Sequence, residues 1–251
     1  MTARLARIFR YPVKSVGGEE LGEVTLTAGQ ALPGDRRFAV MHADALRQLT
    51  EGALARWLPK AAFLRGAAAA PLQAVRGGWE GDVLALTHPD LPPLRFDPAG
   101  DDTPLLDWLA PLWAASGKAP PERLVEGPQP LMDVSHPWLS ILSLDSLSDL
   151  ETRLSQPLGV DRWRGNLWLE GLPPYAERDM QLHQIRIGAV TLRVTERIGR
   201  CDATSADTAT GQRDLDMPAA LERQFMHRDF GIYAEVQHGG TIRPGDEVEI
   251  L

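Results

Sequence analysis

The chain has 251 residues, of which 43% are hydrophobic, so it can bury one large core or two smaller ones. Its net charge at pH 7 is −8, and no basic stripe is available to neutralise phosphates, which argues against non-specific nucleic-acid binding. The single cysteine excludes an intrachain disulfide, a Cys-x-x-Cys redox pair, a multi-cysteine zinc site and an iron–sulfur cluster held by four cysteines.

Short strands dominate the first half of the chain. Alternating apolar and polar residues between turn signals predict strands at 5–11, 21–27, 36–44 and 82–89. Strands at this spacing favour a barrel or a sandwich. Two helices are expected among them. The Ala/Leu-rich segment 50–70 predicts a short one, and Thr103 stands at the cap of the other, over 103–113.

The Pro- and Gly-rich segment 114–130 is the best boundary in the chain, and it predicts two domains, residues 1–118 and 119–251. In the second half, leucines at helical spacing predict a helix over 145–154. The other elements read as strands, including one at 166–171, a hairpin that turns at Gly188 and a closing strand. The expected fold class is therefore mainly β with a few helices (α+β).

The N-terminus has no apolar core long enough for a signal peptide, and no run approaches 18 apolar residues. We therefore expect a cytoplasmic protein with no membrane-spanning segment.

Polar side chains that could carry chemistry gather in four short segments: YPVKS (11–15), GDRRF (34–38), VDRWRGN (160–166) and IGRCDAT (198–204). Arg162 and Arg164 would share one face of an extended segment. Cations and hydroxyls at strand ends can hold a phosphate, and a thiolate near them can ligate a soft or borderline metal. Taken singly, each has a simpler explanation. A lone cysteine is most often a small buried hydrophobe, and paired arginines are usually solvated or ion-paired.

The order of these segments is more specific than any one of them. YPVKS and GDRRF are followed by VDRWRGNLWLEGLPPYAERDM, IRIGAVTLRVTERIGRCDATSADTATG and GIYAEVQHGGTIRPGDEVEIL. In this order they resemble MOSC-domain proteins that begin with an N-terminal MOSC β-barrel domain, of the kind that includes the mitochondrial amidoxime reducing component and its bacterial relatives. The resemblance implies an N-terminal β-barrel-like domain and a MOSC β-barrel domain. Residues 45–130 carry little of it.

The resemblance also implies a bound molybdenum cofactor, whose metal would be ligated by Cys201. Arg37 is preferred over Arg36 for one contact to the pterin or its phosphate. The full set of cofactor contacts that the motifs imply is Lys14, Ser15, Arg36, Arg37, Arg164, Asn166, Arg200 and Tyr233.

The implied activity is reduction of small N-hydroxylated compounds, namely hydroxylamines, amidoximes or N-hydroxylated nucleobases. The chain ends at Leu251 without the ferredoxin-like domain of some bacterial relatives. Electrons are therefore expected from a separate donor, such as a flavin reductase, a ferredoxin or a cytochrome b5-like protein. Two alternatives stay open. One is a cofactor or sulfur carrier that uses a Cys201 persulfide without turnover, and the other is a binding module whose site is vacant.

Overall fold

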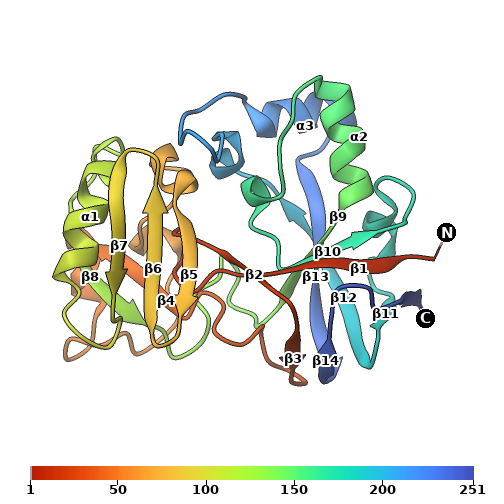
Figure 1. Ribbon diagram of the computed structural model, residues 1–251, viewed down its shortest axis with the longest axis horizontal. Coiled ribbons are helices and arrows are strands. Elements are labelled where there is room, and N and C mark those ends of the chain that lie inside the picture. The colour runs from red at the N-terminus through yellow and green to blue at the C-terminus, as the bar shows by residue number, and fades with distance from the viewer. Residues whose placement is uncertain (1) are drawn as a thin grey trace.

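The computed structural model describes residues 2–251 as a mainly β protein with three α-helices in that range, which confirms the predicted fold class. Figure 1 shows two lobes side by side. The smaller lobe carries α1 (Thr103–Ala114), and the larger one carries α2 (Leu144–Leu154), α3 (Met217–Phe225) and both chain ends. Among the described helices, none has the length and apolar character needed to cross a membrane.

The larger lobe is an eight-stranded sheet in the order β15-β11-β12-β13-β9-β10-β1-β2. Only β9 and β10 pair in parallel. The amides of Leu5 and Val248 donate to the carbonyls of Asp246 and Ala3 at 2.8 Å each, so the sheet closes into a barrel. Its strands are β1 (Arg4–Arg10), β2 (Glu19–Leu21), β9 (Leu139–Ser143), β10 (Leu167–Glu170), β11 (Gln184–Ile187), β12 (Val190–Gly199), β13 (Asp229–His238) and β15 (Val248–Ile250).

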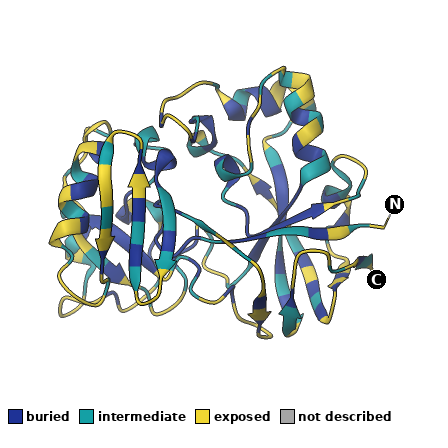
Figure 2. Ribbon diagram, viewed as in Figure 1, coloured by how far each residue is buried: buried dark blue, intermediate teal, exposed yellow. Residues whose placement is uncertain are grey.

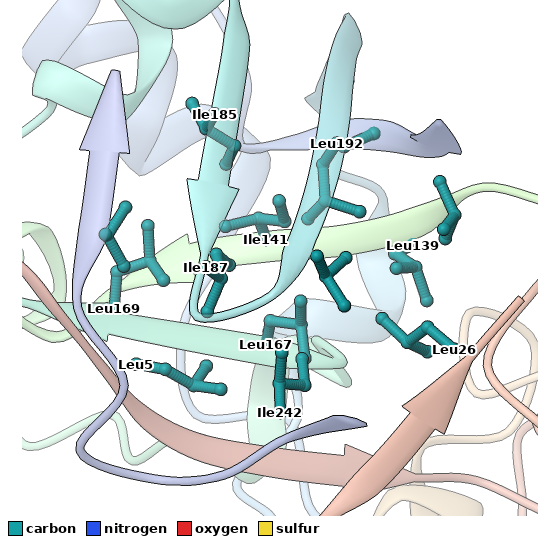
Figure 3. Packing of buried hydrophobic residues seen from close by; sticks show 14 of the residues in the cluster. Leu5, Leu26, Leu139, Ile141, Leu167, Leu169, Ile185, Ile187, Leu192 and Ile242 are labelled. Carbon is teal, nitrogen blue, oxygen red and sulfur yellow. The ribbon is translucent and has the colours of Figure 1, made fainter. Parts of the chain in front are cut away.

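Aliphatic side chains fill this barrel. Alternate residues of each strand face inward, and in β11 they are Ile185 and Ile187, both fully buried. Figure 3 shows them packed with Leu167, Leu192 and other branched side chains from several strands. In Figure 2 the buried colour accordingly follows the middle of the strands, while the outer face of α2 is largely exposed. The packed barrel is a rigid support for the loops at its ends.

The smaller lobe contains a three-stranded meander and a separate strand pair, with α1 packed against both β7 and β8. Leu105, Leu109 and Trp113 of α1 are buried in its core.

A further two-stranded ribbon joins early and late parts of the chain. The strands are β5 (Arg76–Glu80), β6 (Val83–His88) and β7 (Leu91–Phe96) in the meander, β4 (Phe38–His42) with β8 (Pro121–Glu126), and β3 (Val24–Leu26) with β14 (Gly240–Ile242) in the ribbon.

The chain crosses between the lobes more than once. β1 and β2 belong to the barrel, although they precede the whole smaller lobe in sequence, and β8 lies within the segment expected to be a linker. Strand pairing therefore links residues on both sides of the predicted division after residue 118, and that division stays a prediction.

The helices expected at 103–113 and 145–154 and the hairpin at Gly188 are present as α1, α2 and β11–β12. The helix expected within 50–70 is wrong. That segment forms only one complete 3₁₀ turn, Lys60–Ala62, and a second turn, η3 (Ala70–Ala74), starts at its end. Pro59 and Pro71 sit at the starts of the two turns, and proline cannot continue a helix.

Candidate functional site

A cavity of about 380 Å³ is lined by residues from both lobes. Seven of its lining side chains are cationic and two are carboxylates, whereas the whole chain carries a net charge of −8. The cavity therefore concentrates positive charge on an acidic protein, which suits an anionic ligand. Eight of the nine residues predicted for the site line it: Lys14, Ser15, Arg36, Arg164, Asn166, Arg200, Cys201 and Tyr233.

Three of these residues hold an unusual backbone conformation. The φ angles of Ser15, Arg36 and Arg164 are 62°, 47° and 51°, in the left-handed region that non-glycine residues rarely adopt. Each costs of the order of 1 kcal/mol. Their concentration around one cavity is typical of a functional site, where sharp local turns aim side chains inward.

Lys14 follows β1 and is almost completely buried. Its Nζ donates to the carbonyl oxygen of Leu131 at 2.8 Å and to Oδ1 of Asp133 at 2.6 Å. Burial lowers the pKa of Lys14, against the opposing attraction of Asp133. Lys60 approaches the other carboxylate oxygen of Asp133 at 3.4 Å. Desolvation opposes the ionised form of Asp133, but Lys14 and then Lys60 outweigh it and hold its pKa at about 2.

Arg36 and Arg164 meet at the ring of Tyr11. Their guanidinium carbons lie 4.7 and 4.3 Å from its centroid, so each makes a cation–π contact. Arg36 pairs with the buried carboxylate of Asp35 and donates to the carbonyl of Arg164 at 2.9 Å. Arg164 donates to the carbonyl of Gly17 at 2.7 Å. Two cations from distant parts of the sequence are thus fixed side by side at one wall of the cavity.

Arg200 closes a second wall. Its Nε donates to the carbonyl of Phe230 at 2.7 Å and its Nη1 to the carbonyl of Trp163 at 3.0 Å, and its guanidinium lies 5.4 Å from the Trp163 ring centroid. Trp163 stacks on Phe230 with ring centroids 4.0 Å apart. These contacts use backbone carbonyls and aromatic faces, and none of them neutralises the charge.

Arg164 and Arg200 form no ion pair with any carboxylate in the described part of the chain, residues 2–251. Desolvation lowers the pKa of each guanidinium to about 10. Both stay protonated at neutral pH, so within residues 2–251 the cavity holds two partly buried cations that no carboxylate pairs with directly. Burying an unpaired charge is costly, and a bound anion would remove that cost.

Cys201 comes immediately after β12, where the chain leaves the barrel and turns into a 3₁₀ turn, η6 (Asp202–Ser205). Its carbonyl accepts hydrogen bonds from the amide and the hydroxyl of Thr204 at 3.0 and 2.9 Å. The thiol is partly exposed to the cavity, and a thiolate there would interact favourably with Lys60 and Arg200.

No cluster of three or more His, Cys, Asp or Glu side chains that could hold a metal is found within residues 2–251. Cys201 contributes the thiol among the lining side chains, so a metal bound there would need further ligands from outside the protein.

The remaining predicted residues play different parts. Asn166 is buried, and its side-chain oxygen accepts from the amide and hydroxyl of Ser140 at 3.1 and 2.8 Å, while its amide nitrogen donates to the carbonyl of Phe9 at 3.3 Å. It therefore ties β1, β9 and β10 together beneath the cavity. Tyr233, on β13, lies against Trp138 with ring centroids 5.9 Å apart, and burial raises the pKa of its phenol.

Arg37 does not reach the cavity. The left-handed turn at Arg36 reverses the chain just before β4, and the Arg37 Nε donates instead to Oε1 of Glu126 on the neighbouring strand, at 2.7 Å. Its side chain is 51% exposed. Of the two arginines, Arg36 lines the cavity, whereas the motif favoured Arg37.

Arg162 also differs from the expectation. Asp161–Trp163 form a 3₁₀ turn and Arg164 is left-handed, so Arg162 and Arg164 do not share a face of an extended segment. The Arg162 guanidinium binds both carboxylate oxygens of Asp214, at 2.8 and 2.7 Å, and the carbonyl of Thr204 at 3.1 Å. It fixes the loop that follows Cys201.

Sequence reasoning missed several residues of the cavity: Lys60, Gln73, Asp133, Trp138 and Trp163. Arg197, which the sequence suggests as a second cation near the Cys201 thiolate, does line the cavity, and Trp163 stands within a quoted motif. Lys60 and Gln73 come from the segment that the motifs do not cover, and no pattern marks them.

Comparisons with known proteins identify the domains of this chain. Residues 134–249 match the MOSC domain, and residues 2–125 match the MOSC N-terminal beta barrel domain. Mitochondrial amidoxime-reducing component 1 of Mus musculus is 31% identical over 123 residues, covering 44% of this chain and 36% of that protein. Molybdenum cofactor sulfurase 2 of Culex quinquefasciatus is 31% identical over 111 residues, covering 44% of this chain and 14% of that protein.

Among solved structures, the YuaD protein of Bacillus subtilis aligns with 100% of this chain and 96% of that chain at 13% identity, with a TM-score of 0.45.

The segment that matches the mouse amidoxime-reducing component spans little more than a third of that protein's length. The two matched domains, in contrast, extend over nearly the whole of this chain. The protein belongs to the MOSC-domain proteins that carry an N-terminal MOSC β-barrel domain.

Proposed function

We propose that the protein is a molybdenum cofactor-binding oxidoreductase that reduces small N-hydroxylated compounds with electrons from a separate donor protein. One observation carries the proposal. Two partly buried guanidiniums, Arg164 and Arg200, pair with no carboxylate of residues 2–251 and line the same cavity as the only cysteine of the sequence. Relatives named as amidoxime-reducing components support the choice of reaction.

The donor set fits this cofactor, a pterin that carries a phosphate and holds molybdenum through a dithiolene. Lys14, Ser15, Arg36 and Arg164 would hold the phosphate and the pterin, because cations and a hydroxyl make the charge-assisted hydrogen bonds that phosphate requires. Cys201 would ligate the metal, with Arg200 and Tyr233 beside it, while Asn166 keeps the wall in place. The bound cofactor would supply two-electron redox chemistry.

In the proposed reaction the N–O bond of the substrate breaks and its oxygen leaves as water. The reaction takes up two protons and two electrons, and the electrons come from the separate donor, in the class of flavin reductases, ferredoxins or cytochrome b5-like proteins. The chain contributes by holding the cofactor, by keeping Cys201 at one end of the β12 strand and by surrounding the substrate with fixed cations.

The first test uses the protein purified from cells supplied with molybdate. We expect it to contain molybdenum and pterin in equal amounts and to reduce 6-hydroxylaminopurine to adenine with an artificial reductant. Cys201→Ala should lose that activity. Equal turnover by the wild type and by this variant would refute the proposed role of the thiol.

A second test separates the cavity from the outer surface. Arg164→Met removes a cation that lines the cavity, and Arg37→Met removes one that lies outside it, paired with Glu126. Loss of one charge-assisted hydrogen bond costs about 1.5–3 kcal/mol, so cofactor affinity should fall about tenfold to a hundredfold in Arg164→Met. Molybdenum content should not change in Arg37→Met. Equal molybdenum content in both variants would contradict this anion site.

The sulfur-carrier alternative keeps one supporting observation, the likeness to proteins named molybdenum cofactor sulfurases. The thiol of Cys201 beside Lys60 and Arg200 would also suit a persulfide, since cations stabilise the anion. Mass spectrometry of freshly isolated protein decides between them. A labile adduct of one sulfur atom on Cys201 without molybdenum favours the carrier, and stoichiometric molybdenum and pterin favour the enzyme.

A further inference from the structure

Gln73 is a polar side chain of the cavity that the proposed function leaves without a task. It is 4% exposed, and it lines the cavity together with Lys60 and Cys201. Within residues 2–251, its carboxamide forms no hydrogen bond with another residue, whereas the other carboxamide of the cavity, that of Asn166, is hydrogen-bonded to Ser140 and Phe9. The Gln73 carboxamide is not among the fully enclosed polar groups that lack a partner, so it is open to the cavity, where a ligand or water can bind it.

The chain makes room for this side chain. Gly66 lies directly against it, and a Cβ atom at that position would stand 1.7 Å from Nε2 of Gln73. Any larger residue would therefore displace the carboxamide. Glycine at 66 has no positive φ to explain it, so the close approach of Gln73 is the local reason for a small residue there.

Gln73 is also held firmly relative to Cys201. It belongs to η3, which packs against η6, the turn that begins one residue after Cys201. Arg213 donates to the carbonyls of Ala67 and Asp202 at 2.8 and 3.1 Å, so one side chain bridges the two segments. The carboxamide is thus fixed on the smaller lobe opposite the thiol's own loop.

We infer that Gln73 is a specificity-determining residue, which recognises N-hydroxylated substrates that carry an N–H donor and a second, acceptor nitrogen, separated by at least one carbon, within reach of one carboxamide. The inference rests on the proposed function and names its substrate class. A carboxamide presents one donor and one acceptor side by side, and glutamine uses both to bind the exocyclic nitrogen and ring nitrogen of adenine. Amidoximes and 6-hydroxylaminopurine both carry such a pair of nitrogens, whereas N-methylhydroxylamine has a single nitrogen bonded directly to its oxygen and cannot span the two groups of the carboxamide. The cations of the cavity cannot replace the carboxamide, because lysine and arginine only donate.

The experiment compares two substrates on the holoprotein. Gln73→Met keeps the length of the side chain and removes both hydrogen-bonding groups. We expect the ratio of kcat/KM for 6-hydroxylaminopurine to that for N-methylhydroxylamine to fall about tenfold to a hundredfold, as expected for lost hydrogen bonds. Gly66→Ala should lower the same ratio, because the added methyl group displaces the carboxamide without deleting it. This variant replaces Gln73→Met in the experiment if Gln73→Met does not fold. Gln30→Met, at an exposed glutamine outside the cavity, is the matched control.

Two results would overturn the inference. One is an unchanged ratio in Gln73→Met and Gly66→Ala. The other is loss of molybdenum from these variants, which would make Gln73 a support of the cofactor instead. If the wild type reduces neither substrate, the proposed function fails, and calorimetric titration of adenine into the purified protein still decides the role of Gln73. Weaker adenine binding by Gln73→Met than by the wild type supports it, and equal dissociation constants refute it.

Discussion

The ion pair between Arg162 and Asp214 offers a sharp test of how the loop after Cys201 is held. The Arg162 side chain is 1% exposed and Asp214 binds it through both carboxylate oxygens, at 2.8 and 2.7 Å. Removing one partner of a buried pair costs about 3–5 kcal/mol. Asp214→Asn retains one acceptor oxygen, the Asp214 side chain is 24% exposed, and the carbonyl of Thr204 still binds Arg162. We therefore expect a loss of about 2 kcal/mol, or about 4–8 °C in Tm.

The measurement is urea unfolding followed by circular dichroism, at pH 7 and again at low pH. The hydrogen bond from Arg162 lowers the pKa of Asp214 in the folded protein. A depressed pKa contributes stability above the unfolded-state pKa, and that stability disappears as the pH falls through the folded-state pKa. The wild type and Asp214→Asn should therefore converge in acid. Asp82→Asn, at an exposed position, is the control. A difference below about 0.5 kcal/mol at pH 7, or one that persists in acid, would refute the reasoning.

Three further predictions concern separate parts of the fold. Glu177 is 1% exposed, and burial raises its pKa although the Ser146 hydroxyl donates to it, so its ionisation opposes folding as the pH rises. Glu177→Gln should therefore raise Tm at pH 7 and flatten the decline of stability above the ordinary carboxyl pKa, as measured by calorimetry across pH. Gly77 has a φ of 102°, and a Cβ there would lie 2.1 Å from the carbonyl oxygen of Ala85, so Gly77→Ala should cost at least about 2 kcal/mol in urea unfolding. Lys14→Met should raise the pKa of Asp133 from about 2 toward its usual range, because Lys14 is the largest stabilising charge, and carboxyl-carbon NMR titration would show it.

Much of the cavity could be predicted because its chemistry lies in short, ordered motifs. Lys14, Arg164 and Cys201 come from three of them, and the barrel brings these distant loops to one place. The choice between Arg36 and Arg37 could not be made from sequence, since it depends on a left-handed residue that alternation does not reveal. Gln73 lay beyond prediction because its role depends on which segment of the smaller lobe packs against η6.

The fold shows a similar division. Alternation located most strands, because it reflects which face of a strand is buried, and leucine spacing located α2. The alternation of residues could not show that β1 pairs with β10, because pairing across more than 150 residues leaves no local pattern. The alanine-rich segment was misread as a helix because alanine favours helices wherever it occurs, whereas Pro59 and Pro71 limit this one to short turns.

The closure of the barrel by its first and last strands has a consequence for biosynthesis. The C-terminal part of β1 pairs with β2, which is made soon after it, but the partners of its N-terminal part, β10 and the turn at 245–248, are made much later. During synthesis most of β1 therefore lacks its strand partners while the smaller lobe, whose strands all lie between residues 38 and 126, can already form. The barrel should stay open, with unpaired strand edges that favour aggregation, until residues 245–250 have been made, and deletion of β15 should have the same effect.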